Sequence, residues 1–320
     1  MLSVYDPQAQ PDAALVPIGA ADLPTVVAAD APVVWIDAAD PTRAELEALA
    51  AAFSWPAHVV DMLDEHEARQ RFLPMGDWSL IAAVSPTGDG VGMIAVRRQC
   101  AVTLRWDWAV DLSGSAREVL QWPDPHAGGM IAVCVLLGHL VENYEDASGG
   151  LEDRLVDQEA TALEPPKGGD PLPSLRETAA LRGAVGDLRR RSNRLREVLG
   201  AVIRQELVDR THGEAVDLDL RDIYDHLLRV HDDLDAYSDR LIALQDARLS
   251  LVSYKQNDIV RKISGWGAVL LIPTITTSWY GQNFAHLWLL DSPWGPVVNV
   301  AVTLVAMGGA VALLRRADWL

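Results

Sequence analysis

Residues 263–290 read ISGWGAVLLIPTITTSWYGQNFAHLWLL, a run of 28 residues without a Lys, Arg, Asp or Glu. After Asp291, a second uncharged run of 23 residues extends from Ser292 to Leu314. A helix that crosses the hydrocarbon core of a bilayer needs roughly 20 apolar residues, so each run is long enough once its loop-like end is removed. The sequence therefore predicts two membrane spans, near residues 263–280 and 296–314.

Basic residues flank these two runs. Arg261-Lys262 precede the first run and Arg315-Arg316 follow the second, while the segment between them has no Lys or Arg. This distribution follows the positive-inside rule and predicts that both termini are cytoplasmic. Because the first 20 residues have no basic start and no apolar core, we expect a two-span inner-membrane protein without a signal peptide. The alternative, a buried hairpin of core helices, is favoured by the hydroxyl residues of the first run.

The rest of the chain is strongly acidic. The chain carries 27 Lys+Arg and 45 Asp+Glu, a formal charge of −18. Residues 1–250 hold 22 of the basic residues and 42 of the acidic ones. Such a balance argues against a phosphate-binding surface and hence against nucleic acid as a partner. The two cysteines, Cys100 and Cys134, are too few for a disulfide framework or a structural zinc site. We expect both to be packing residues.

A long helix is predicted directly before the first apolar run. Residues 214–264 contain no Gly or Pro over 51 residues, which indicates helix. Earlier helical segments, residues 130–163 and 175–207, provide partners for it. Its apolar residues recur at spacings of three and four, the heptad pattern of helices that pack together; they are Leu220, Ile223, Leu227, Val230, Leu234, Tyr237, Leu241 and Leu244.

The N-terminal part has a different pattern. Asp40-Pro41-Thr42 places an acceptor side chain ahead of a helix from Arg43 to Phe53. Short runs rich in β-branched residues, separated by turn signals, predict strands; they lie at residues 33–36, 78–84, 91–96 and 101–104. The sequence does not give the strand order. It predicts an α/β domain.

The fold class expected is therefore an α+β membrane protein in three parts. These are an N-terminal α/β domain over residues 1–125, a helical stalk over 126–262 and a membrane domain over 263–320. Neither a phosphate-cradling Gly-x-x-x-x-Gly-Lys-Ser/Thr loop nor a Gly-x-Gly-x-x-Gly motif is present, and the eight histidines do not form a metal-ligand set. We expect solvated histidines and a protein that is not an enzyme.

Tyr280-Gly281-Gln282-Asn283-Phe284 stands at the end of the first predicted span. With the long helix before it and the short loop, second span and basic ending after it, this motif resembles Tyr-Gly-Met-Asn-Phe of the CorA magnesium transporter family, two-span metal ion transporters with a Gly-x-Asn motif. The sequence departs from the family at Gln282, where Met is usual, and in the outer loop. Further landmarks in the family's order are Trp35-Ile36-Asp37, residues 222–227 and residues 249–253.

The resemblance implies a homopentamer with an N-terminal α/β cytoplasmic domain, a funnel of long helices and a pore lined by the first span. It places the selectivity filter at Gly281, Gln282 and Asn283, where a ring of Asn283 amides binds the hydration shell of Mg²⁺ and Gly281 permits the turn. The pore-lining positions that it implies are Val260, Ile263, Gly267, Leu271 and Thr274. From the residues alone, these positions are equally consistent with ordinary helix packing.

The function that the resemblance implies is passive Mg²⁺ influx driven by the membrane potential, with Co²⁺, Ni²⁺ or Zn²⁺ as other candidate ions. A regulatory Mg²⁺ is expected at Asp246 together with an acidic residue of the neighbouring subunit. Asp61 and Asp64 are the candidates for that neighbour, although from the residues alone they belong to a solvated acidic run.

Two alternatives stay open at this point. One is a zinc-transporting, ZntB-like relative of the same architecture, with proton coupling undecided, in which His286 and Asp291 capture the ion. The other is a two-span membrane sensor or scaffold whose coiled coil transmits a signal. The sensor accounts for the heptads and the membrane anchor but not for the Gly-Gln-Asn motif.

Overall fold

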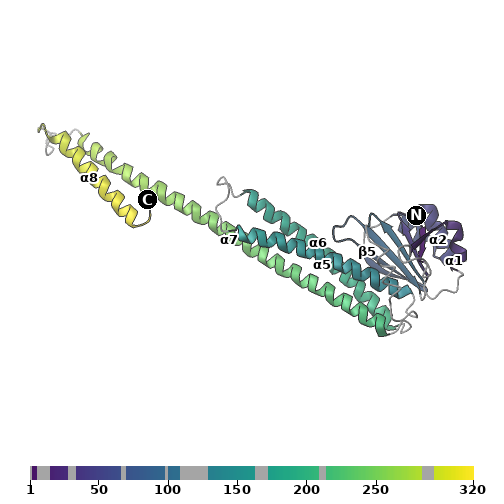
Figure 1. Ribbon diagram of the computed structural model, residues 1–320. Coiled ribbons are helices and arrows are strands. Elements are labelled where there is room, and N and C mark those ends of the chain that lie inside the picture. The colour runs from purple at the N-terminus through teal and green to yellow at the C-terminus, as the bar shows by residue number, and fades with distance from the viewer. Residues whose placement is uncertain are drawn as a thin grey trace. The chain divides into compact units, whose positions relative to one another are not determined.

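The computed structural model describes residues 2–5, 15–27, 34–65, 70–97, 100–108, 129–162, 172–208, 214–282 and 292–320 (Figure 1). The chain forms two compact units. The first unit comprises Met1–Ala160 and Pro173–Ile242, and the second comprises Thr161–Leu172 and Ala243–Leu320. The strands are β1 Leu2–Tyr5, β2 Leu15–Ile18, β3 Val34–Ala39, β4 Arg71–Met75, β5 Trp78–Val84, β6 Val91–Arg97 and β7 Cys100–Trp106. The helices are η1 Ala20–Asp22, α1 Leu23–Val27, α2 Arg43–Phe53, α3 Ala57–Asp64, α5 Gly129–Ala160, α6 Leu172–Val208, α7 Glu214–Tyr280 and α8 Gly295–Arg316.

The first unit contains a seven-stranded sheet of order β2-β1-β3-β7-β6-β5-β4. Its central pair, β3 and β7, is parallel, with Val34 opposite Cys100, and the other neighbours are antiparallel. The four predicted strands are confirmed: β5 has the predicted bounds, and the other three lie within three residues of them. The sequence reasoning did not find β1, β2 and β4.

Helices cover both faces of this sheet. On one face, Ile36, Met93 and Leu104 share a hydrophobic core with Leu49 of α2 and Leu63 of α3. On the other face, α5 packs against β3, β6 and β7. A strand that is buried on both faces needs no polar alternation, which explains the continuous apolar runs of β5 and β6.

A buried ion pair joins the two parallel strands. Asp37 of β3 is 3% exposed and accepts hydrogen bonds from Arg105 Nε at 3.0 Å and Arg105 Nη2 at 2.9 Å. The Thr103 hydroxyl donates to Asp37 at 2.7 Å and accepts from the Trp35 indole at 3.2 Å. Side chains therefore hold β3 and β7 together in addition to the backbone ladder.

The start of α2 follows the predicted capping pattern. Thr42 is the N-cap, and its hydroxyl accepts from the Glu45 backbone N–H at 3.3 Å. Glu45 in turn accepts from the Thr42 backbone N–H at 2.9 Å, and this hydrogen bond lowers the pKa of the Glu45 carboxyl. The two residues form a capping box, which satisfies two N–H groups at the helix start. The predicted bounds of α2 are confirmed.

Three helices, α5, α6 and the first part of α7, lie side by side in the first unit (Figure 1). The predicted heptad residues are buried, with Leu220, Leu227, Leu234 and Leu241 at 0% exposure. Polar contacts add to this packing, because Arg240 donates to Glu159 at 2.7 and 3.0 Å and thereby lowers the pKa of that carboxyl. The expectation of solvated histidines is wrong for His226, which is half-buried and lies 2.7 Å from Glu145 of α5.

Neither cysteine forms a disulfide, and both pack as predicted, Cys134 buried and Cys100 partly buried. Burial raises the pKa of the Cys100 thiol to about 12, because it disfavours the thiolate. The thiolate is the reactive form, so at pH 8 only ~10⁻⁴ of Cys100 is reactive, against about a quarter for an ordinary cysteine.

In a Cys134→Ser variant we expect iodoacetamide to label Cys100 about 10³-fold more slowly in the native protein than in urea. Equal labelling rates would contradict the burial.

Candidate metal-conduction site

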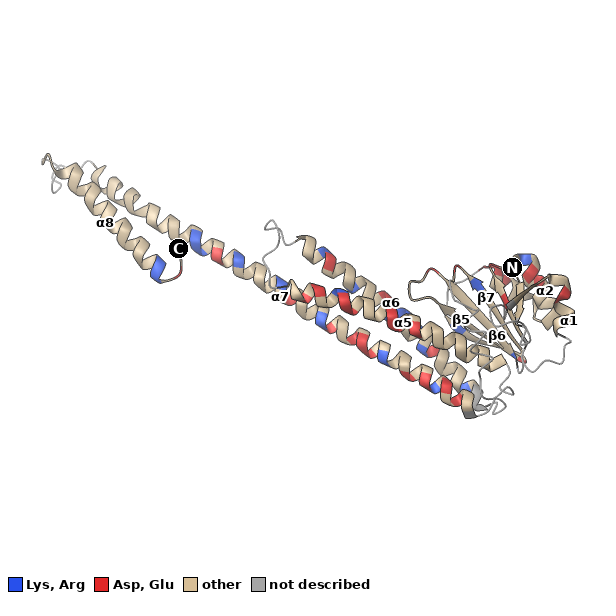
Figure 2. Cartoon of the chain, in the orientation of Figure 1, with Lys and Arg blue, Asp and Glu red and all other residues tan. Residues whose placement is uncertain are grey.

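The second unit contains the end of α7, from Ala243, and α8. Both helices hold an apolar window long enough to cross a membrane, and only 11% of the α7 window and 6% of the α8 window are buried. Figure 2 shows the end of α7 and the body of α8 without charge, with Arg315 and Arg316 at the last turn of α8. A core hairpin would bury these windows, so the exposed apolar surface favours a bilayer.

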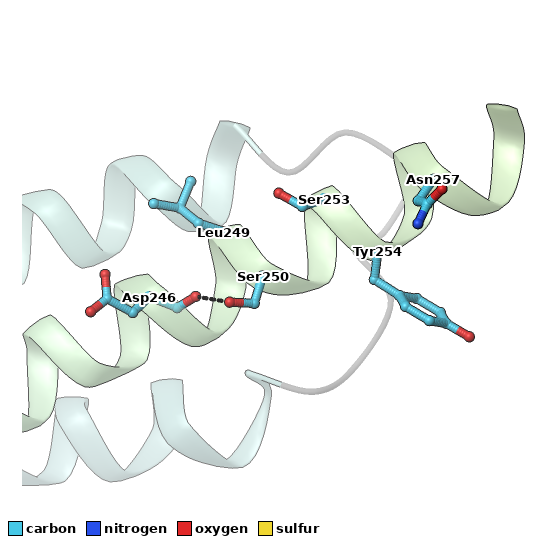
Figure 3. Close-up of a pocket in the computed structure, with 6 residues that line it drawn as sticks. All are labelled: Asp246, Leu249, Ser250, Ser253, Tyr254 and Asn257. Atoms are coloured by element: carbon cyan, nitrogen blue, oxygen red, sulfur yellow. Dashed lines mark hydrogen bonds between the residues drawn. The ribbon is translucent and has the colours of Figure 1, made fainter.

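Polar side chains line one open side of α7 just before its apolar end (Figure 3). Asp246, Ser250, Ser253 and Asn257 border a hollow of about 610 Å³, with Leu249 and Tyr254 beside them. Their spacing of four, three and four residues keeps them on one helix face. Ser250 donates to the Asp246 backbone oxygen at 2.8 Å, and within the described part of the chain the Asp246 carboxylate has no ion-pair partner. It is free to accept a cation.

The predicted pore-lining residues continue this face toward the end of α7. Val260, Ile263 and Leu271 are 59%, 67% and 57% exposed, and Gly267 and Thr274 are exposed as well. We name the whole set the α7 stripe; it comprises Asp246, Ser250, Ser253, Asn257, Val260, Ile263, Gly267, Leu271 and Thr274. Beyond Asp246 the stripe is uncharged, and its hydroxyl and amide side chains give way to apolar ones.

The α7 stripe faces away from α8. The side of α7 that contacts α8 is marked by Val269, which is 1% exposed, and by a 3.0 Å hydrogen bond between the hydroxyls of Thr276 and Thr303. A helix turns by about 100° per residue, so Gly267 and Thr274, each two positions before a contact residue, point about 200° away from it. Within the second unit α8 therefore does not cover the α7 stripe, which leaves this face available for other contacts.

The predicted filter residues follow the last turn of α7. The Gly281 N–H donates to the Thr277 backbone oxygen at 3.0 Å, and Gln282 is exposed. Gly281 has no positive φ, and a Cβ there would lie 3.4 Å from the Thr277 oxygen, an ordinary contact. In the single chain the backbone at Gly281 would therefore also accommodate a residue with a side chain. Asn283 lies outside the described residues, as do His286 and Asp291.

Asp61 and Asp64, the candidate regulatory ligands, already have a cationic partner. Arg43 donates to Asp61 at 2.8 Å and to Asp64 at 2.9 Å, and these two carboxylates raise the pKa of its guanidinium. Among the residues that the structure describes, no three His, Cys, Asp or Glu side chains are arranged to hold a metal ion. A Mg²⁺ ion at Asp61 and Asp64 would compete with the Arg43 guanidinium for these carboxylates, whereas at Asp246 it would meet no such competitor among the described residues.

Sequence reasoning did not assign Ser250, Ser253 and Asn257 to the site. The available signal was their helical phase: in the series Asp246, Ser250, Ser253, Asn257 and Val260, each residue stands three or four positions after the one before it. A polar stripe that continues an apolar one on the same helix face could have been found by extending the series backward from Val260.

Three comparisons place the chain among known proteins. The sequence profile of the CorA-like Mg²⁺ transporter protein family matches residues 30–316. The cobalt/magnesium transport protein CorA of Thermotoga maritima is 28% identical over 185 residues, which are 58% of this chain and 51% of that protein. The zinc transport protein ZntB of Pectobacterium carotovorum is 27% identical over 193 residues, 58% of this chain and 53% of that protein. The match thus spans about half the length of each relative.

A solved structure agrees over the whole chain. The complete structure of the CorA magnesium transporter from Methanocaldococcus jannaschii superposes with a TM-score of 0.77 at 19% identity, covering 100% of this chain and 99% of that one. The N-terminal α/β part, the long helix and the two C-terminal apolar helices are therefore a CorA fold. Since the family profile matches most of the sequence as well, the chain belongs to the CorA-like Mg²⁺ transporter family.

Proposed function

We propose that this protein is a divalent cation channel that conducts Mg²⁺ into the cell as a homopentamer. The observation that carries the proposal is the α7 stripe, which faces away from α8 and is uncharged from Ser250 to Thr274. Five copies of α7 that turn this stripe inward would enclose a pore. The proposal includes an inner-membrane location with both termini cytoplasmic, and the three-part division at residues 125 and 262.

Selectivity is assigned to Gly281, Gln282 and Asn283 at the outer end of α7. Mg²⁺ gives up its water reluctantly, so a ring of neutral amide oxygens suits the hydrated ion better than a charged cage that strips it. The Asn283 amides would form that ring, and the Gln282 carboxamide, which is exposed in the single chain, would add further oxygen dipoles.

The driving force and the gate follow from charge and hydropathy. Two charges that move inward gain roughly 4.6 kcal/mol per 100 mV, so influx needs no other energy source. Val260, Ile263 and Leu271 present apolar surface on the stripe and would close the pore by dewetting when the helices approach.

Flux through reconstituted protein tests this proposal directly. Liposomes that contain the purified chain and an internal Mg²⁺ indicator are compared at zero and at inside-negative potential. We expect influx that rises with the imposed potential, carried by a pentamer in native mass measurement. A pentamer without influx would refute the transport function, and a dimer would favour the sensor.

Regulation is proposed at Asp246, whose carboxylate would bind Mg²⁺ together with Asp61 or Asp64 of the neighbouring subunit. The N-terminal part is strongly acidic, so divalent cations between subunits would relieve the electrostatic repulsion between them.

In an Asp246→Ala variant we expect Mg²⁺ to protect the protein much less against trypsin than in the wild type. The control Asp153→Ala, at an exposed position of α5, should keep the protection. Arg43→Ala should lower the Mg²⁺ concentration needed, because a competing cation is gone. Full protection in Asp246→Ala would remove this residue from the scheme.

Zinc is the second candidate ion. One relative is named a zinc transport protein, and Gln282 replaces the Met that is usual in the Mg²⁺-transporting family. His286 and Asp291 would then capture the ion at the entrance, because imidazole is a preferred zinc ligand. Zn²⁺ flux that excludes Mg²⁺ in a competition assay, and that falls in His286→Ala, would select this alternative.

A further inference from the structure

A second hollow, of about 540 Å³, lies in the α/β part of the first unit. Its wall is formed by Phe53 and His58 around the α2–α3 turn, by Met75, Asp77 and Trp78 of the β4–β5 hairpin, and by Arg97 at the end of β6. The volume falls within the range of small-molecule sites. None of these residues belongs to the α7 stripe or to the filter.

The floor of this pocket is part of the hydrophobic core. Phe53 and Trp78 are each 5% exposed, and Trp55 behind them is 6% exposed. The three rings pack at centroid distances of 5.0 to 5.8 Å, two pairs edge-to-face and one pair stacked. Side chains that are locked in this way cannot collapse into the hollow, so the apolar surface is present before any ligand binds.

The polar groups around this floor are mainly donors. The Arg97 guanidinium lies 5.5 Å from the centroid of the Trp78 ring and is exposed. Among the described residues Arg97 and His58 have no ion-pair partner. The Asp77 carboxylate is the charged acceptor of the wall, and among the described residues it forms no ion pair with Arg97.

We propose that this pocket binds a small organic anion whose carboxylate pairs with Arg97 and whose flat apolar body lies against Phe53, Met75 and Trp78. A carboxylate matches the planar guanidinium with two parallel hydrogen bonds, which a neutral amide cannot reproduce. Asp77, the acidic group of the wall, would disfavour ligands with more than one negative charge. The proposal does not depend on metal transport.

The probe for this site is 4-fluorobenzoate, followed by ¹⁹F line broadening with the full-length protein in nanodiscs. We expect saturable broadening that is absent from empty nanodiscs, and binding at least tenfold weaker for the neutral 4-fluorobenzamide. Arg97→Ala should weaken 4-fluorobenzoate tenfold or more, while Arg154→Ala, an exposed arginine of α5, should leave it unchanged.

A readout without any variant guards against misfolding of Arg97→Ala. On addition of 4-fluorobenzoate, amide hydrogen exchange in wild-type protein should slow in residues 73–78 and not in α8. Absence of saturable binding, equal affinity for the benzamide, or an unchanged affinity in correctly folded Arg97→Ala would each overturn the proposal. Loss of Mg²⁺ flux alone would not affect it.

Discussion

Replacing Asn283 with Ala is expected to reduce Mg²⁺ influx into liposomes at least tenfold. The side-chain amide would supply the neutral oxygen dipole that the family resemblance places on the ion. Alanine has no such dipole, so the Gln282 carboxamide would be the one side-chain amide left in the Gly-Gln-Asn motif. Without such dipoles at the entrance, the protein makes fewer favourable contacts with the water shell of the incoming cation. The apolar residues of the α7 stripe cannot take the place of these contacts.

The control for this variant is Asn193→Ala on α6, which removes an amide that accepts a 2.8 Å hydrogen bond from Arg196. It should lower stability slightly and leave flux unchanged. Both variants must keep the oligomeric state of the wild type, because a disassembled pore also loses flux. Undiminished influx through Asn283→Ala pentamers would contradict the proposed filter, since the same ion path would then work without it.

Replacing Asp37 with Ala is expected to lower the free energy of unfolding by about 3 kcal/mol. This value is near the lower end of the cost of removing one partner from a buried ion pair. The loss leaves the Arg105 guanidinium, whose side chain is 20% exposed, without its charge partner, and leaves the Thr103 hydroxyl without its acceptor. In a unit of roughly 230 residues this corresponds to a fall in melting temperature of about 6 to 12 °C.

A double variant separates the lost pair from the lost side-chain volume. In Asp37→Ala/Arg105→Met no buried charge is left without a partner, so part of the stability should return. Asp153→Ala, at an exposed position of α5, should change the melting temperature by less than about 2 °C. A melting temperature for Asp37→Ala within that same range would show that the ion pair contributes nothing measurable.

The parts of the fold that local signals specify were predictable from the sequence. The Thr42 cap and its Glu45 partner fix the start of α2, and the absence of Gly and Pro from residues 214–264 identifies the long helix. By contrast, β1, β2 and β4 are short strands of four or five residues, and β2 and β4 are the edges of the sheet. They have too few residues for a periodic pattern to stand out.

Contacts between distant positions account for the rest. The acidic residues Asp61 and Asp64 looked free for a metal, but the packing of α3 on α2 brings Arg43 to both of them. His226 likewise meets Glu145 only because α5 lies beside α7, 81 positions apart in sequence. The pore-lining positions of α7 came from the family resemblance. Helical phase, a local property, explains why they share one face, but the partner of that face in the assembly is not a local property.

The parallel pairing of β3 with β7 sets the order in which the sheet can fold during synthesis. Residues that meet across this pair, such as Val34 and Cys100, are 66 positions apart, whereas β4, β5 and β6 are joined by short turns. A hairpin forms in about 1–10 μs, but at 5–20 residues per second the ribosome needs roughly 3–13 s to deliver β7 after β3. During that interval β3 has β1 on one side, with Val4 opposite Ile36, but its other edge is unpaired, and Trp35 and Ile36, which are 0% exposed in the native protein, are incompletely covered. Newly made chains should therefore benefit from a chaperone, or from rapid translation of the segments that follow, until β7 pairs with β3.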